Sequence, residues 1–580
     1  MYKTRLVLII ILLTNFNIFS QAEEQFTVND TINNLSTTND VVDFFSISLS
    51  DDELNDDTSA SDNISGLLNS SMDVFYRTAA YEFSSSFFKV RGLDSDNAIV
   101  HINGIKMNKL YNGRPQWSNW GGLNDVLRNQ ELSNGSIPLK YNFGGILGSN
   151  NINIRASEYG EGGRITYSSS NRSYSNRLMA TYNSGMLEKG WAYSLSIGRR
   201  WGNEGYQDAS FYDSNSAFLS VQKIFNSKHS LNLAAIYAPN RRGKVSPNTQ
   251  EVYDLKGIKY NEYWGYQDGE KRNSRVKRVV EPIILLNHDW SIDENSSLET
   301  SIGYQFGEMG NSRLDYAGGG NPSPAYYQDL PSYFLADTNG PDYEGAYIAQ
   351  ENFVNDGQIN WNRIYDANIT NNLSNLNAAY VLYEDRVDDT QLTINSAYNR
   401  EINENIKITS SVNYRNLVSD NFAEISDMLG GYSYSNIDSF DNLDYNLLSP
   451  NSIVSDGDKF KYHYKMNAEE ISLFSMINFS YNKLEFYLAG DLTNTTYQRD
   501  GIFENEANAG NSSGKGEEIK FDGYGVKAGI TYKFSGKHIL DFNSAYLQKA
   551  PSIRNTFTNS RVNHNVAVSY THLRAHETTV

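Results

Sequence analysis

Residues 524–534 run Tyr-Gly-Val-Lys-Ala-Gly-Ile-Thr-Tyr-Lys-Phe, and this stretch decides the fold. Every second position is apolar, at Tyr524, Val526, Ala528, Ile530, Tyr532 and Phe534, and Gly, Lys or Thr stands between. A period of two predicts a β-strand with one apolar and one polar face. The opposite orientation would place Lys527 in lipid, at a free-energy cost of roughly 2–4 kcal/mol near the midplane of the membrane. We therefore predict that the apolar face meets lipid and that Lys527 faces a polar lumen.

Strands of the same kind follow one another from residue 163 onward. Short polar turns join neighbours, as at Ser535-Gly536-Lys537, Asn482-Lys483 and Asn403-Glu404-Asn405, and such turns are typical of tight hairpins. The pattern predicts about thirteen strands, near 163–170, 175–184, 190–200, 214–224, 229–238, 282–291, 297–307, 388–402, 405–416, 469–481, 483–494, 522–534 and 537–548.

The connections between these strands alternate between short and long after the second strand. The long ones cover residues 201–213, 239–281, 308–387, 417–468 and 495–521. Bacterial outer-membrane barrels have this order, with short periplasmic turns and longer extracellular loops, whereas a secreted β-sandwich has no reason to keep it. An open sheet of thirteen strands would leave backbone groups unsatisfied in lipid, so we expect further strands to follow.

The N-terminus has the pattern of an export signal over residues 1–22. Lys3 and Arg5 precede the apolar run Leu6–Leu13, and the small residues Ser20 and Ala22 are candidate cleavage points. The run is too short to span a membrane. At the other end, residues 569–580 break the alternation, and we interpret them as a non-native tail on a truncated reading frame.

Composition agrees with a barrel and disfavours several other classes of protein. The 580 residues have 13% aromatics, and the mean hydropathy is −0.55 with no later run of 18 apolar residues, which argues against a helical membrane protein. The absence of Cys excludes disulfides and a lipid-anchored Cys. The net charge of −19 argues against nucleic acid as a partner. No catalytic motif is present, and we predict neither enzymatic activity, nor a cofactor, nor a metal site.

Residues 51–157 show the mixed pattern of a compact α+β domain. Six motifs lie there in order: Asn63–Leu68 (NISGLL), Phe88–Gly92 (FKVRG), Val100–Gly104 (VHING), Trp117–Val126 (WSNWGGLNDV), Phe143–Gly148 (FGGILG) and Ile152–Ile154 (INI). The series resembles the plug of TonB-dependent outer-membrane receptors, and the WSNWGGLNDV motif is similar to Bacteroidetes-type members. The resemblance covers the plug fully and the barrel, residues 158–568, only loosely. Its motif residues are Arg91, Gly92, Asn103, Gly104, Gly144, Gly145 and Gly148; the glycines suit tight turns and close packing.

This resemblance implies a plug inside a barrel of about 22 strands when complete. It also implies that a scarce ligand bound outside is released inward when a periplasmic TonB-type energy-coupling protein pulls on the plug. Within the extension 23–50, the candidate contact for that protein is Phe44, Phe45, Ser46, Ile47, Ser48 and Leu49, through strand addition. The same residues could instead be the first strand of the plug. We expect Arg91 to pair with carboxylates.

Two aromatic clusters in the long loops are the candidate ligand contacts. One holds Tyr260, Tyr263, Trp264 and Tyr266, and the other holds Tyr316, Tyr326, Tyr327, Tyr333 and Phe334. Aromatic faces stack on sugars or on catecholate and haem-like rings, although packing between loops is the commoner use of such residues. The acidic groups Asp438, Asp441, Asp444 and Asp456, Asp458 lack the spacing of a calcium loop.

The sequence therefore predicts a transporter whose partners are outer-membrane lipid, the coupling protein and an extracellular small ligand. The siderophore, cobalamin, haem and oligosaccharide classes all stay open. The short stretch between signal and plug leaves no room for the extra domain of starch-utilisation receptors, which weakens the oligosaccharide class. Two alternative functions stay open: a non-transporting outer-membrane receptor or adhesin, and a secreted carbohydrate-binding β-protein.

Overall fold

The computed structural model describes residues 46–49, 93–133, 135–169, 174–336, 340–535 and 538–567. All of them fall in one compact unit. The predicted export signal, the helix at 63–68, Phe44, Phe45, Arg91, Gly92 and the tail 569–580 lie outside the described residues. The domain boundaries stay predictions.

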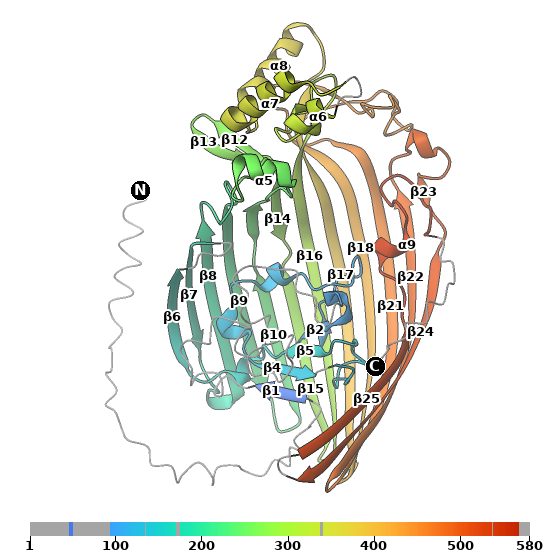
Figure 1. Cartoon of the computed structure of the whole chain (residues 1–580). Coiled ribbons are helices and arrows are strands. Elements are labelled where there is room, and N and C mark those ends of the chain that lie inside the picture. Colours follow the sequence, from blue (N-terminus) through green and yellow to red (C-terminus); the bar gives the residue numbers. More distant parts are fainter. Residues whose placement is uncertain are drawn as a thin grey trace, which may run out of the picture. The chain divides into compact units, whose positions relative to one another are not determined.

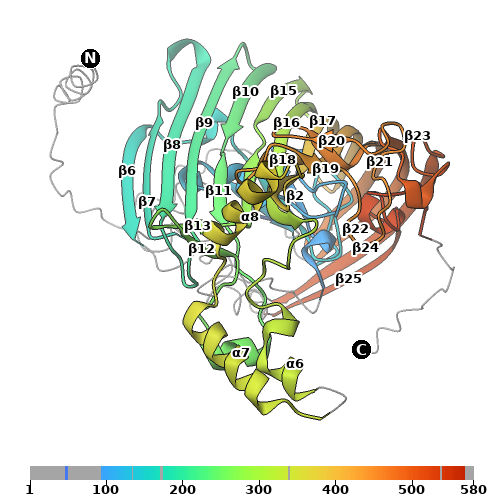
Figure 2. The same ribbon diagram turned by 90° about the horizontal axis from the view of Figure 1, so that it is seen from above.

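One antiparallel sheet of sixteen strands dominates the structure and curves around residues 93–159 (Figures 1 and 2). Consecutive strands pair with each other along the sheet, from β6 at one edge to β25 at the other. The strands are β6 (Gly162–Ser169), β7 (Asn176–Asn183), β8 (Trp191–Gly202), β9 (Tyr212–Ile224), β10 (His229–Tyr237), β11 (Asn240–Gly243), β14 (Val276–Val280), β15 (Ile283–Asp293), β16 (Ser296–Tyr316), β17 (Tyr380–Asn403), β18 (Ile406–Asp427), β21 (Lys459–Tyr481), β22 (Leu484–Gly501), β23 (Gly514–Lys515), β24 (Ile519–Ser535) and β25 (His538–Gln548).

All thirteen predicted strands are confirmed. Two of them are interrupted once, because Pro239 divides β10 from β11 and Pro282 divides β15 from β14, and proline cannot donate a ladder hydrogen bond. The short strand β23 pairs only with β22 among the described strands. The predicted turn at Asn482 joins β21 to β22, where Asn482 has a φ of 48° that asparagine tolerates better than most residues.

The predicted orientation of β24 is also confirmed. Val526 and Ile530 are 52% and 43% exposed on the convex face, whereas Lys527 between them is fully buried on the concave face. Exposed Tyr, Leu, Ile, Val and Phe side chains continue this apolar surface across β6–β10, β15, β16, β18, β21, β22 and β25. The convex face therefore carries a broad apolar band.

The strands on either side of the longest loops run further than the sequence predicted. β16 continues to Tyr316 and β17 begins at Tyr380, so the loop between them is shorter than the predicted 308–387. Beyond the apolar band the convex face is charged: Glu308 on β16 pairs with Arg278 of β14 and Arg386 of β17. Charged residues on both faces hide the period of two, although the ladder itself continues.

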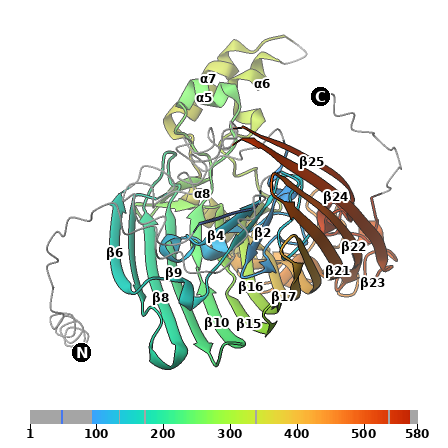
Figure 3. The same cartoon turned by 90° about the horizontal axis from the view of Figure 1, so that it is seen from below.

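Residues 93–159, here named the inner segment, lie against the concave face (Figures 2 and 3). A five-stranded sheet, in the order β1-β4-β5-β2-β3, joins this segment to β1 (Ser46–Leu49); the other strands are β2 (Ile99–Ile102), β3 (Ile105–Lys106), β4 (Gln130–Ser133) and β5 (Ser149–Ile152). Short 3-10 turns lie at Ser95–Asn97, Trp117–Trp120, Asn124–Val126 and Ala156–Glu158. The WSNWGGLNDV motif contributes Trp120, Leu123 and Val126 to an apolar cluster with Phe218 of β9 and Leu285 of β15.

Long connections gather at one end of the sheet (Figure 1). They contain α5 (Gln250–Lys256), β12 (Trp264–Gln267), β13 (Glu270–Asn273), α6 (Pro331–Leu335), α7 (Tyr343–Asp356), α8 (Trp361–Leu373), β19 (Tyr434–Ser435) and β20 (Ile453–Val454), and α9 (Ile553–Thr556) follows β25. Thr249, Asp342 and Asn360 cap α5, α7 and α8 through side-chain oxygens that accept backbone N–H bonds. None of the helices in the described ranges is long and apolar enough to cross a membrane.

Candidate functional site

The turn between β2 and β3 fastens the inner segment to β15 of the large sheet. Asn103 and Gly104 have φ values of 46° and 79°, and a Cβ at Gly104 would lie 2.7 Å from the ring of Tyr141. The Asn103 amide donates to Asn287 Oδ1 at 2.8 Å, and Asn287 Nδ2 donates back to Asn103 O at 3.1 Å. The predicted motif residues Asn103 and Gly104 therefore form a contact with the sheet.

The loop of the FGGILG motif is fastened to β24. Lys527 Nζ donates to the carbonyl oxygens of Phe143 at 2.6 Å and Gly145 at 2.9 Å. Gly145 has no room for a side chain, because a Cβ would lie 1.9 Å from Asn97 O. Gly144 and Gly148 have φ values of 76° and 92°. The inward face of β24 therefore holds this loop through its one buried lysine.

Charged side chains connect the upper part of the inner segment to the sheet. Lys109 contacts Glu281, which follows β14, and donates to Asp389 of β17 at 2.9 Å. Burial opposes the charge of Lys109, but the two carboxylates outweigh it and raise its pKa above the ordinary value. Asn119 of the WSNWGGLNDV motif donates to the other oxygen of Glu281 at 2.8 Å. One cation thus bridges two strands and the inner segment.

A second group of ion pairs lies nearer the opposite end of the sheet. Arg155 pairs with Asp289 of β15 at 2.9 Å and with Glu299 of β16 at 3.2 Å, and Lys140 pairs with Glu299 at 2.7 Å. Tyr141 also donates to Glu299, at 2.8 Å. Because Arg155 is buried and the side chain of Glu299 is only 15% exposed, loss of either one would leave a poorly hydrated charge without its partner.

A polar cavity of about 480 Å³ separates the inner segment from β18, β21, β22 and β24. Lys106 and Arg415 both pair with Glu470 in its wall, at 3.2 Å and 3.4 Å. Arg415 also donates to Asn108 O of the inner segment at 2.6 Å. His101 lies nearby, and burial together with the charge of Lys106 lowers its pKa to about 3. The side of the inner segment that faces this cavity is therefore held by hydrogen bonds and charges.

The predicted energy-coupling segment is partly described. Ser46–Leu49 form β1, which pairs antiparallel with β4 from Ser46↔Ser133 to Leu49↔Gln130. These four residues therefore form a strand of the inner sheet, as in the second of the two interpretations given for them above. β1 lies at the end of the strand order and pairs only with β4 among the described strands, so none of the described strands covers its other edge.

The first aromatic cluster of the loops serves mainly to pack two loops together. Tyr260 is buried, donates to Gly357 O at 2.7 Å and lies edge-on to Phe353 of α7. Trp264 on β12 is buried as well, with Lys271 over its ring at 4.7 Å. Tyr263 lies under Arg275 at 5.1 Å, and Tyr266 is 59% exposed. Tyr263 and Tyr266 are the members that a ligand could still reach.

The second cluster divides between a strand end and a loop surface. Tyr316 ends β16 and packs partly buried beside Trp361 and Tyr380. Tyr326, Tyr327 and Tyr333 form a chain of edge-on rings with centroids 4.9 and 5.8 Å apart, and Phe334 extends it. Tyr327 is 58% exposed. This chain of rings is the larger exposed aromatic surface of the loops.

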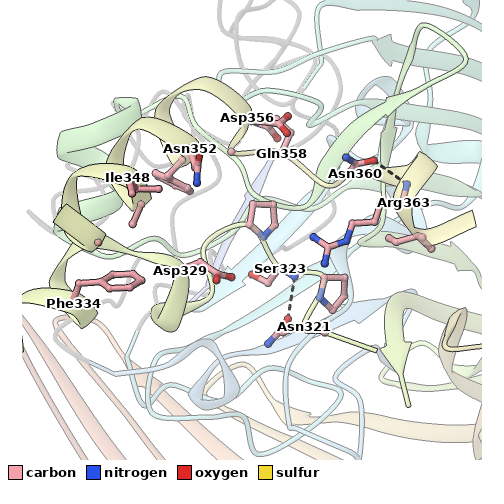
Figure 4. Close-up of a pocket in the computed structure, with 18 of the residues that line it drawn as sticks. Asn321, Ser323, Asp329, Phe334, Ile348, Asn352, Asp356, Gln358, Asn360 and Arg363 are labelled. Carbon is pink, nitrogen blue, oxygen red and sulfur yellow. Dashed lines mark hydrogen bonds between the residues drawn. The ribbon is translucent and has the colours of Figure 1, made fainter. Parts of the chain in front are cut away.

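A cavity of about 580 Å³ lies beside that chain, between α6, α7, α8 and the loop that follows β16 (Figure 4). Its wall includes Asn321, Ser323, Asp329, Phe334, Ile348, Asn352, Asp356, Gln358, Asn360 and Arg363. Asn321 Oδ1 accepts from Ser323 N, and Asn360 Oδ1 accepts from Arg363 N at the start of α8, so each side chain stabilises its own turn. Amide, carboxylate and guanidinium groups give this wall both donors and acceptors. Sequence reasoning did not find this cavity, because its residues gather only when the loop folds.

The acidic residues of the β18–β21 loop stabilise its turns. Asp438 accepts the N–H groups of Phe440 at 2.9 Å and Asp441 at 3.2 Å, and Asp458 accepts Ser455 N at 2.9 Å. No group of His and carboxylate side chains in the described ranges is arranged to hold a metal ion.

Sequence reasoning missed the cations that fasten the inner segment, namely Lys106, Lys109, Lys140 and Arg155. It assigned such a role to Arg91, which lies outside the described residues. A signal was present: Glu299, Glu470 and Lys527 are charged residues at inward positions of strands whose outward positions are apolar. Each needs a partner, and the inner segment supplies it.

No family model matches the sequence, and no curated protein matches it. Among solved structures, the chain is similar to the ferric-catecholate import receptor Fiu from E. coli K12 in its open form, with a TM-score of 0.52 and 11% identity over 87% of this chain and 70% of that one. Two others are the copper transporter OprC (TM-score 0.49, 9% identity, 85% of this chain and 61% of that one) and the ferric citrate transporter FecA without ligand (0.47, 9%, 79% and 55%). The likeness to Fiu establishes the fold class predicted from the sequence.

Proposed function

We propose that this chain, which has the fold of TonB-dependent outer-membrane receptors, takes up a scarce ligand across the outer membrane with energy relayed from the inner membrane. One observation carries the proposal: a sheet with an apolar convex face curves around an N-terminal segment that is bonded to its concave face. A segment held in this way blocks the passage until it is moved. The proposed activity is transport, without catalysis.

The apolar convex face supports a place in lipid. Ile165, Ile197, Leu492 and Phe542 are each more than 60% exposed on well-separated strands. A secreted carbohydrate-binding protein would present this continuous apolar band to water, where patches of such extent drive association. Alternation between an apolar outer face and a polar inner face is what a lipid-embedded barrel requires.

The edge of β1 that no described strand covers supports strand addition as the route of energy coupling. An extended segment of a periplasmic TonB-type protein could pair with backbone groups that β4 leaves unused. Pulling on β1 would then act directly on β4, and through β5 on the strands that carry the Asn103–Gly104 turn.

We place ligand capture at the long loops, which lie at the end of the large sheet opposite the short turns. The 580 Å³ cavity and the exposed rings of Tyr266, Tyr327 and Tyr333 are the surfaces there that suit a small molecule. Fiu is by its name a receptor for ferric catecholates. For this chain the siderophore, cobalamin, haem and oligosaccharide classes are separated by the experiment below.

The test uses the full chain in cells that have, or lack, the TonB-type protein. We expect the chain in the outer-membrane pellet, extractable only with detergent. Labelled ferric enterobactin, cobalamin, haemin and maltoheptaose serve as uptake probes, and at least one should accumulate only when both proteins are present. Ile47→Pro should abolish accumulation and capture of the TonB C-terminal domain, because proline removes a backbone donor from β1. Thr27→Pro, in the upstream extension, is the matched control.

Accumulation that continues without the TonB-type protein, or capture that Ile47→Pro and Thr27→Pro weaken equally, would contradict the proposal. Ligand binding at the cell surface with no accumulation of any probe would favour a non-transporting receptor. Recovery of the chain from the culture supernatant would favour the secreted alternative.

A further inference from the structure

Five cations gather on the concave face of three neighbouring strands, above the inner segment. Arg242 of β11 lies directly beside Lys277 of β14 in the register, and Lys277 lies beside Asn311 of β16. Lys244, Arg275 and Arg313 complete the group, which we name the basic patch. Its face is the concave one, because Glu281, two alternations beyond Lys277, contacts Lys109 of the inner segment.

β14, β16 and their neighbour β17 also carry charges on the convex face, and those charges are paired with one another. Arg278 pairs with Glu308 and, at 3.7 Å, with Glu384, and Arg386 pairs with Glu308 and Asp388. Arg241, the neighbour of Arg242, lies opposite Arg278 in the register and stacks over Phe211 at 5.2 Å. The two faces of β14 therefore differ in how their cations are balanced, whereas on β11 Arg241 contacts an aromatic ring and makes no ion pair with a carboxylate of the described residues.

Most of the basic patch has no carboxylate to balance it. Arg313 pairs with Asp385 at 2.8 Å, and Arg561 shares that carboxylate at 3.3 Å. Arg242, Lys244, Arg275 and Lys277 make no ion pair with any carboxylate in the described part of the chain. Glu262, Glu281 and Asp385 exert attraction from further away, and each is already bonded elsewhere, to Ser323, to Lys109 and to Arg313.

The positive charges of the patch repel one another. Burial and the charges of Arg313, Arg275 and Arg242 lower the pKa of Lys244, and burial with Arg313 lowers the pKa of Arg275. Like charges at this density oppose folding, and in a chain of net charge −19 carboxylates were available to relieve them. An arrangement that costs stability and is not neutralised from within is suited to an anion from outside.

Access to the patch is open. Arg242 is exposed, and Lys244, Arg275, Lys277 and Arg313 are all partly exposed. Tyr263 supports Arg275 from behind at 5.1 Å, and Tyr212, the other register neighbour of Arg242, supports Arg200 at 5.2 Å. Guanidinium groups held against rings keep their N–H donors free for a planar anion.

We propose that the basic patch binds the transported ligand through at least two anionic groups, each a carboxylate or a phosphate. The inference rests on the proposed function and names the chemical class of its ligand. Four unpaired cations on adjacent strands match an anion with two or more charged groups better than a single one. The site lies between the loops and Lys109, so a bound anion would sit directly on the inner segment.

The experiment measures binding by calorimetry with the full chain in detergent micelles. Citrate and inorganic pyrophosphate are the anionic probes, and maltotriose is the neutral probe. We expect dissociation constants below about 1 mM for at least one anion, weakening strongly between low and high salt because exposed charges are screened. Arg242→Gln and Lys277→Gln should each weaken binding about tenfold. Arg241→Gln, one residue away on the convex face, should leave it unchanged.

Arg242→Lys keeps the charge and should retain most of the affinity, which separates lost charge from lost fold. The proposal is overturned if neither anion binds, if maltotriose binds as well as the anions, or if Arg241→Gln weakens binding as much as Arg242→Gln. This inference and the proposed function are contradicted by different results. TonB-dependent uptake of a neutral probe without anion binding would contradict this inference alone. Anion binding without any coupled uptake ends the proposed function instead.

Discussion

Lys527 of β24 donates a hydrogen bond from its ammonium group to the carbonyl oxygen of Phe143 at 2.6 Å, although the two residues are 384 positions apart in the chain. The ammonium group also lies 4.5 Å from the centre of the Phe143 ring. It is fully buried and uses backbone carbonyls as its partners. This bond therefore joins the inward face of the sheet to the FGGILG loop of the inner segment.

Replacement of Lys527 by Met should loosen that loop without unfolding the sheet. A hydrogen bond to a charged group contributes about 1.5–3 kcal/mol, so local opening of residues 143–149 should become about tenfold more frequent or more. Amide hydrogen exchange, followed by mass spectrometry, measures this directly. Lys520→Met on the exposed part of the same strand is the control, and equal exchange in both variants would show that Lys527 does not hold the loop.

Single cysteines can test which face of β24 meets lipid, because the chain has no Cys of its own. A fluorophore at Val526→Cys or Ile530→Cys should be quenched by brominated lipid chains after reconstitution. A fluorophore at Thr531→Cys, on the buried face, should be quenched far less. Equal quenching at the three positions would contradict an apolar face in lipid.

Acid should weaken the docking of β2 through His101. Its folded pKa of about 3 lies below the ordinary value near 6.5, so the neutral imidazole favours the folded state. The contribution is fully present above pH 6.5 and is lost as the pH falls toward 3, at up to about 1.4 kcal/mol per pH unit. Exchange of the β2 amides should therefore rise more steeply with acid in the wild type than in His101→Gln, which retains the carboxylates but lacks the titrating ring. Identical slopes would remove His101 as the cause.

Asn368 of α8 should be the key residue for the order of the longest loop. Its amide donates to Tyr380 O, Met428 O and Leu429 O, and its oxygen accepts Ala379 N and Tyr380 N. Asn368→Ala leaves these buried groups without hydrogen-bond partners, which costs about 1–3 kcal/mol of stability for each group. The loop should therefore open more often, and trypsin should cleave faster after Arg363. Asn372→Ala, at a partly exposed position on the same helix, should have a much smaller effect because water replaces its one bond. Similar cleavage rates for both variants would contradict this assignment.

The sheet was predictable from the sequence wherever its two faces meet different surroundings. In β24 the contrast between Ile530 and Lys527 was enough to assign both strand and orientation. The ends of β16 and β17 were not predictable, because Glu308 and Arg386 stand on a convex face that is as polar as the concave one there. Periodicity reports a difference between faces, and where that difference ends the signal ends with it.

The candidate site was predictable only in part. Gly104 was recognisable because its turn geometry is local, whereas Lys109 could not be assigned since its partners Glu281 and Asp389 are distant in sequence. Loop aromatics such as Tyr260 and Tyr327 have the same sequence signature, yet one is buried between loops and the other is exposed. The basic patch depends on the register of β11 against β14, which no local pattern contains.

The inner segment is attached unevenly to the wall around it. Ten of its residues share one apolar cluster with β9, β10 and β15, whereas two join the cluster on β21 and β22 and one joins the cluster that includes β17 and β18. Apolar contacts persist until the two surfaces separate by the width of a water molecule. Ion pairs beside a cavity can instead be replaced by contacts with water one at a time. A pulling force on the segment would therefore separate it first from the side of the sheet that carries Glu470 and Lys527. The apolar contacts with β9, β10 and β15 would act as the hinge of this rotation.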